Sequence, residues 1–368
     1  MKKEHKSLIR KDGFQTLLAS LVCVLGGLIV GYLVLLIIEP SGAFEAIIAV
    51  MKSFLRFPGA LKLKYFGQAL VRTAPLLLCA LSVLFAYKVG MFNIGAAGQY
   101  CAGACAALYA ALAWNMPWYV CILLGMLAGA LRTLFNVNVV ISGIMLNWIT
   151  LYLTNLVLGT VKNPTSPYTK TLQSTNPGAL IPSLGLEKLF NNEKSVTIAI
   201  PIAVLTAVLV WVVLNKTKFG YELKATGSNY NAAKYCGMKE NQNIILTMVI
   251  AGALAGFGAG LLYLTGIEDW ETTISSVPAM GFNGIAVAFL GGLSPIGSIL
   301  SAFFIQYITT GGGNVDLQVY CSQISSLISA LIIYLCAFVG FFKYFIQTRL
   351  RKADERKAAQ IQEGGEDK

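Results

Sequence analysis

The chain has 368 residues, of which 56% are hydrophobic and 12% are charged, and its formal net charge is +11. Soluble domains carry about 25% charged residues, so this composition argues against a soluble enzyme and excludes a disordered chain. We therefore expect a single polytopic membrane domain.

Ten apolar runs approach the roughly 20 residues that a helix needs to cross a bilayer. The eighth and ninth are short and separated only by Ser294 and Pro295, so we expect half-helices or tilted helices there. The ten expected spans are Phe14–Ile38, Phe66–Tyr87, Val89–Ala113, Trp118–Leu131, Val139–Gly159, Val196–Leu214, Ile244–Gly266, Ala279–Leu293, Ile296–Thr310 and Ser322–Phe342.

The basic residues predict the orientation of these spans. A cytoplasmic N-terminus places most of the 28 lysines and arginines on the cytoplasmic side, as the positive-inside rule requires. We therefore expect a basic cytoplasmic tail (1–13), one transmembrane domain (14–345) and a charged cytoplasmic tail (346–368). Within the domain, loop 215–243 is expected to be cytoplasmic and loop 161–195 external.

Small residues recur every four positions in two of the spans. Gly98 and Ala102 begin one such stripe, and Gly252, Gly256 and Gly260 form another. Small side chains at this spacing let helix backbones approach closely, and packing holds helices together in lipid. These residues therefore predict tightly packed helices.

Four of the amide side chains within the expected spans, which contain no Asp or Glu, stand out: Asn93, Gln99, Asn147 and Asn283. An amide in hydrocarbon needs a hydrogen-bond partner, which another helix or a solute can supply. Because amides both donate and accept, they suit a neutral, hydroxyl-rich or heterocyclic solute. The sequence leaves open whether they bond helices together or line a translocation path.

Asn93 and Asn283 lie in short segments of similar sequence. The letters GMFNIG start at Gly90, and GFNGI starts at Gly281. Transporters are often built from repeats whose binding sites lie at matching interrupted helices. This similarity therefore suggests a functional relation between the two segments.

Other chemistries find little support in the sequence. Its only histidine is His5, so we predict no metal site, and no phosphate-binding G-x-x-x-x-G-K-[ST] motif is present. A membrane enzyme would need acids, bases or metal ligands at membrane depth. A secondary transporter that works without an ATPase stays open as an alternative.

Six blocks of sequence form a recognisable set: MFNIGAAGQ at 91–99, MLN at 145–147, GYELKATG at 220–227, AGALAG at 251–256, GFNGIAVAFLG at 281–291 and PIG at 295–297. Together they resemble the permease subunits of ABC importers, closest to the nucleoside branch. Simple-sugar permeases are similar, and branched-chain amino-acid permeases are more distantly so. The family usually has a longer stretch where this chain has 128–139, and usually a Glu where Val139 stands.

The resemblance implies an all-α bundle like that of type II ABC importers. It also implies a second permease subunit, separate ATPase subunits and an extracellular solute-binding lipoprotein in a bacterial plasma membrane. This chain would then import a nucleoside, or alternatively a simple sugar, and would neither catalyse a reaction nor bind a cofactor. ATP would be used by the partner, and no nucleic acid would be bound.

Loop 215–243 resembles the family's cytoplasmic loop and is expected to contact the ATPase. Asn229 can cap a short helix over Tyr230–Cys236, and Gly237 can end that helix in the left-handed conformation. The residues expected to couple the permease to the ATPase are Lys224, Gly227, Asn229, Ala232, Ala233 and Gly237.

Overall fold

The computed structural model describes residues 12–133, 141–314, 320, 327–328, 330–331, 334–335 and 338–363. The regular structure of these residues is helical and includes no strand, which confirms the all-α class. The longer helices are α1 (Asp12–Ile38), α3 (Gly59–Tyr87), α4 (Ala96–Leu112), α5 (Trp118–Thr133), α6 (Ile141–Leu158), α8 (Ala199–Lys216), α9 (Lys218–Ser228), α11 (Glu240–Tyr263), α12 (Ala279–Leu290), α13 (Pro295–Gly312) and α15 (Val339–Glu363).

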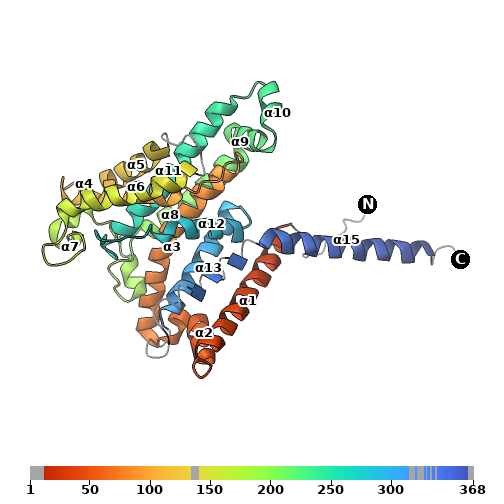
Figure 1. Cartoon of the computed structure of the whole chain (residues 1–368), viewed down its shortest axis with the longest axis horizontal. Coiled ribbons are helices and arrows are strands. Elements are labelled where there is room, and N and C mark those ends of the chain that lie inside the picture. Colours follow the sequence, from red (N-terminus) through yellow and green to blue (C-terminus); the bar gives the residue numbers. More distant parts are fainter. Residues whose placement is uncertain are drawn as a thin grey trace.

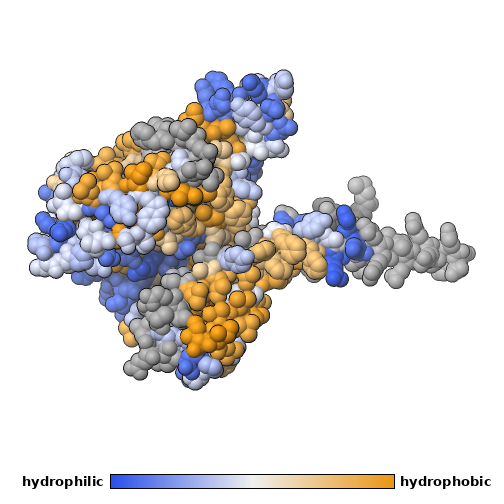
Figure 2. Space-filling model, viewed as in Figure 1, coloured by the Kyte–Doolittle hydropathy of each residue, from blue (hydrophilic) through white to orange (hydrophobic). Residues whose placement is uncertain are grey.

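Five stretches of helix are long and apolar enough to cross a bilayer: Leu18–Ile38, Gly59–Tyr87, Ser142–Val161, Ala199–Lys216 and Glu240–Tyr263. Shorter apolar helices, Trp118–Leu131 and Ala279–Leu290, accompany them. Hydrophobic residues cover α1, while hydrophilic ones gather over α9 and α10 and near α7 (Figure 2). The chain is therefore a polytopic membrane protein.

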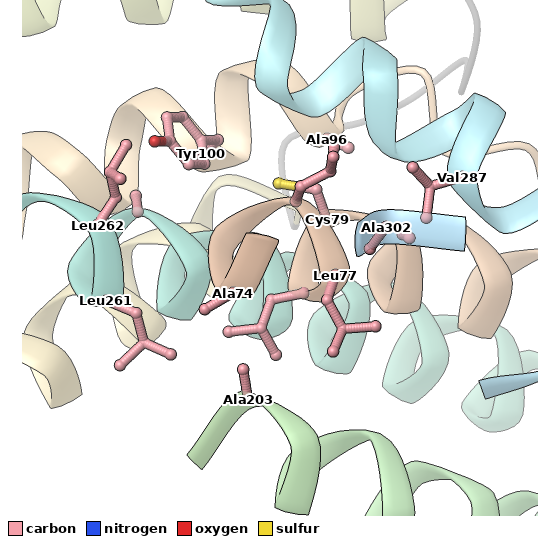
Figure 3. Packing of buried hydrophobic residues seen from close by; sticks show 14 of the residues in the cluster. Ala74, Leu77, Cys79, Ala96, Tyr100, Ala203, Leu261, Leu262, Val287 and Ala302 are labelled. Carbon is pink, nitrogen blue, oxygen red and sulfur yellow. The ribbon is translucent and has the colours of Figure 1, made fainter. Parts of the chain in front are cut away.

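Helix α3 forms the centre of the bundle. In the most apolar stretch of α3, 89% of the residues are buried, compared with 28% of the residues in that of α8. Around Ala74, Leu77 and Cys79 of α3, Figure 3 shows side chains from several other helices: Ala96, Tyr100, Ala203, Leu261, Leu262, Val287 and Ala302. Helix α8 thus lies at the periphery of the bundle, while α3 is enclosed by the other helices.

Glycines bring α4, α5 and α11 into direct backbone contact. A Cβ atom added at Gly103 of α4 would collide with the backbone of Gly256 on α11, and one at Gly256 would collide with Gly125 of α5. Gly252 meets Gly129 of α5 in the same way. Close approach of this kind is how small residues hold helices together in lipid.

The two ends of the bundle differ (Figure 1). At one end, called here the α9–α10 end, the end of α3 meets α9, and the short helix α10 packs against α9. At the other, the α7 end, the short helices α2, η2, α7, η4 and η5 cover the bundle. The short elements are α2 (Ala43–Lys52), η2 (Ser53–Arg56), η3 (Gly159–Val161), α7 (Leu172–Thr175), η4 (Pro177–Ala179), η5 (Leu186–Phe190) and α10 (Tyr230–Tyr235).

Every span expected before Ser322 overlaps a helix, although some bounds differ. Helix α4 begins at Ala96 rather than Val89, because Gly90 has a φ of 80°, outside the helical region. Helix α12 ends at Leu290, where Gly291 and Gly292 follow. Helix α2 was not expected at all. The tenth expected span, Ser322–Phe342, and the shortened stretch 128–139 lie partly outside the described residues.

Candidate functional site

Three of the four amides meet where a non-helical segment, residues 91–95, leads into α4. Asn93 is 1% exposed and donates from Nδ2 to Oε1 of Gln99 at 2.8 Å and to Oγ of Ser82 at 3.1 Å. Among the described residues, its Oδ1 atom has no hydrogen-bond partner. A buried acceptor without a donor costs about 1–3 kcal/mol, so a polar ligand that reached this atom would recover part of that cost.

Asn147 of α6 holds the start of α4 in place. Its Oδ1 accepts from the backbone N–H of Gly98 at 2.9 Å, and its Nδ2 donates to the carbonyl of Ile94 at 3.1 Å. The first N–H groups of a helix have no partner within that helix, so this side chain caps α4 from a neighbouring helix. Asn147 therefore connects α6 to the segment that carries Asn93.

Asn283 is near the start of α12 and is half-buried. Its side chain makes no hydrogen bond within the described part of the chain. Two residues earlier, a Cβ atom at Gly281 would collide with Ala97 in the first turn of α4. The structure therefore brings together the starts of α4 and α12, the two segments whose sequences echo each other.

All the side-chain partners named above are neutral. The N-terminus of α4 supplies a partial positive charge from its backbone dipoles, but a formal charge on a ligand would find no counter-ion among these amides and hydroxyls. Ser82, which is fully buried in α3, was missed from the sequence. A lone serine within an apolar run gives only a weak signal.

The packing glycines and alanines occupy different surroundings. Gly252 and Gly256 lie at the junction of α5 and α11, and a Cβ atom at Gly260 would have ordinary contacts with Ile122 at 3.6 Å. Ala102 faces a groove of about 380 Å³ between α5 and α6 instead. Gly103, the next residue, packs against α11 and was not singled out from the sequence.

At the α9–α10 end, α10 has the capped start expected from its sequence. Oδ1 of Asn229 accepts from the N–H of Ala232 at 3.0 Å, and Gly237 has a φ of 74° just after the helix. Ala232 is exposed, whereas Ala233 is only 3% exposed and faces the protein. Tyr235, which was missed from the sequence, is 93% exposed.

Helix α9 rests directly on the end of α3. A Cβ atom at Gly227 would collide with the carbonyl of Lys88, so only glycine allows this approach. Burial, and then the nearby charge of Lys224, lowers the pKa of Lys88. Lys224 itself donates to Oδ1 of Asn215 at 2.8 Å. A displacement of α9 would therefore press on the residues that precede Asn93.

Residues 65–337 match the family model described as the permease component of branched-chain amino acid transport systems. The guanosine ABC transporter permease protein NupP of Bacillus subtilis is 30% identical, over 91% of this chain and 97% of its own length. The nucleoside ABC transporter permease protein NupB of Lactococcus lactis is 33% identical, over 80% and 84%. The glucose ABC transporter permease protein TsgB13 of Haloferax volcanii is 28% identical, over 76% and 77%. No solved structure matches the chain.

Proposed function

The chain belongs to the family of permease components of branched-chain amino acid transport systems, and we propose that it is the membrane subunit of an ATP-driven ABC importer of nucleosides. Relatives named for guanosine and nucleoside transport are 30% and 33% identical, compared with 28% for the glucose permease. A simple sugar is the alternative solute.

The buried, unpartnered Oδ1 of Asn93 is the observation that carries this proposal. It lies in an uncharged cluster beside the starts of α4 and α12, and helix starts are a common setting for a transporter binding site. We propose that the solute passes between α4, α6 and α12. Nucleosides carry hydroxyl and ring N–H donors, which suit an amide oxygen.

Transport would be powered through α9 and α10. We propose that an ATPase subunit docks on α10, and that its movement reaches Asn93 through the contact between Gly227 and Lys88. The chain would bind no cofactor itself, with ATP used by the partner. A second permease subunit and an extracellular solute-binding lipoprotein would complete the importer.

Uptake of labelled guanosine by the complex reconstituted in liposomes tests the function. ATP-dependent accumulation of guanosine in the presence of the binding protein supports a nucleoside importer. If the complex takes up glucose or ribose but not guanosine, the chain belongs to a sugar importer instead. Guanosine uptake by the permease without its ATPase would instead show a secondary transporter.

We expect glutamate at Ala232 to reduce the amount of ATPase that co-purifies and to abolish coupled uptake, because a bulky charge would fill an exposed docking position. Serine at Ala232 is the matched control and should keep both. Removing the Tyr235 ring by substitution with alanine should also weaken association. If the glutamate variant binds the ATPase normally and still transports, α10 is not the docking helix.

Labelling of cysteines in intact cells tests the proposed orientation, with the α9–α10 end and both termini in the cytoplasm. Cys236 is exposed at the α9–α10 end, and Lys170 is exposed at the α7 end. An impermeant maleimide should label Lys170→Cys, built on a Cys236→Ser background, but should reach native Cys236 only after permeabilisation. Labelling of Cys236 alone in intact cells would reverse the orientation.

A further inference from the structure

A second cavity opens at the α7 end, on the segment that joins α11 to α12. Its volume is about 580 Å³, within the range of about 300–1,000 Å³ that is typical of small-molecule sites. Three aromatic rings and three carboxylates line it: Tyr168, Tyr263, Trp270, Glu268, Asp269 and Glu271. No amide of the candidate site lines this cavity, so it is a separate place for a ligand.

The aromatic wall of the cavity is held rigidly. Trp270 is 2% exposed, and its Nε1 donates to Oδ1 of Asn155 at 2.9 Å. Asn155 in turn donates to the carbonyl of Ile274 at 2.8 Å, which fixes the far part of the same segment. Tyr168, by contrast, is 44% exposed, so its ring is available to a ligand.

Two of the three carboxylates already have partners. Glu268 forms an ion pair with Arg72 of α3, and Oε1 of Glu271 accepts from the hydroxyl of Thr273 at 3.1 Å. Asp269 has no hydrogen-bond or ion-pair partner among the described residues. Burial raises its pKa, which reflects a carboxylate that has lost water without gaining a donor. A ligand with hydroxyl or N–H donors would satisfy it.

Aromatic contacts lead from this cavity to the amide cluster. The Trp270 and Tyr263 ring centroids are 5.7 Å apart, and those of Tyr263 and Tyr100 are 6.3 Å apart. Tyr100 directly follows Gln99 in α4. The cavity is therefore connected to the proposed translocation path by packed side chains.

We propose that this cavity is the first binding site for the nucleoside on the permease, with the base against the rings of Tyr168 and Tyr263 and Asp269 accepting from sugar hydroxyls or a base N–H. This inference rests on the proposed function. Aromatic faces stack on any base, and a carboxylate accepts from neutral donors more strongly than an amide does. A metal ion fits less well, because two of the three carboxylates are already engaged.

The test uses the complete importer in liposomes, with guanosine as the probe. Asp269→Asn, which keeps an acceptor oxygen but removes the charge, should lower the initial rate of uptake at low guanosine concentration by about five- to tenfold, the difference between a hydrogen bond to a charged acceptor and one to a neutral acceptor. Alanine at Tyr168 should lower it too. Glu45→Gln, an exposed carboxylate of α2 outside this cavity, is the matched control and should keep the full rate.

A second measurement examines binding directly, without the binding protein. An impermeant maleimide should label Ile274→Cys, which lines the same cavity and leaves Asp269 in place, in the complex of permease and ATPase, and excess guanosine should slow that labelling. Normal uptake by Asp269→Asn, or labelling that guanosine does not slow, would overturn the binding site while leaving the nucleoside importer intact. Absence of guanosine uptake by the unmodified complex would instead overturn the proposed function.

Discussion

Alanine at Gly256 should destabilise the bundle by about 1–3 kcal/mol, the usual cost of overpacking a filled core. Its Cβ atom would collide with the carbonyl of Gly125, and Gly129 lies close behind at 3.3 Å. All these atoms belong to the backbone of α5, which no side-chain rotation can move aside. Helices α5 and α11 would have to separate, and α4 would lose its contact at Gly103.

Alanine at Gly260 is the matched control, since it makes the same change one turn later on α11. Its Cβ atom would have only ordinary contacts with Ile122 at 3.6 Å, and alanine favours the helix by up to about 1 kcal/mol over glycine. Thermal unfolding in detergent should therefore separate the two variants clearly. Equal stability of both would show that the glycine junction does not limit packing.

Local rules predicted the short helix α10 well, because its deciding residues lie close together in the sequence. Asn229 and Gly237 define the two ends of α10 through the chain's own backbone, so the capping rules were sufficient. Apolar run length likewise located the spans. It missed α2, because this helix is apolar but has only ten residues, too few to cross a bilayer.

Contacts between distant segments could not be predicted in this way. The apolar run through Val89 suggested an early start to α4, but Asn147 of α6 caps a helix that begins at Ala96. The sequence grouped four amides by their chemistry alone. Their separate positions depend on which helix each one faces, and that is decided by packing across the bundle.

The cavity around Asp269 shows the same limit. Its carboxylate belongs to a charged run, Glu268 to Glu271, that reads as a solvated loop in the sequence. Only the fold reveals that Arg72 and Thr273 engage the neighbouring carboxylates and leave Asp269 half-buried without a partner.

Leucine at Asn283 should lower guanosine uptake by about several-fold to a hundredfold, while the thermal stability of the permease stays nearly unchanged. The Asn283 amide makes no hydrogen bond within the described residues, so its removal orphans no protein group. Leucine at Asn93 should lower uptake as well, because it removes the unpartnered Oδ1 along with the bonds to Ser82 and Gln99.

Leucine at Asn147 should lower stability more than uptake, and it serves as the structural comparison. It leaves the N–H of Gly98 and the carbonyl of Ile94 without this partner, so stability should fall by about 1–3 kcal/mol. Uptake, normalised to folded protein, should fall less than it does in the Asn283 variant. If the variants at Asn93 and Asn283 both keep normal normalised uptake, the solute does not pass between α4 and α12, and Asn93 and Asn147 serve only to join helices.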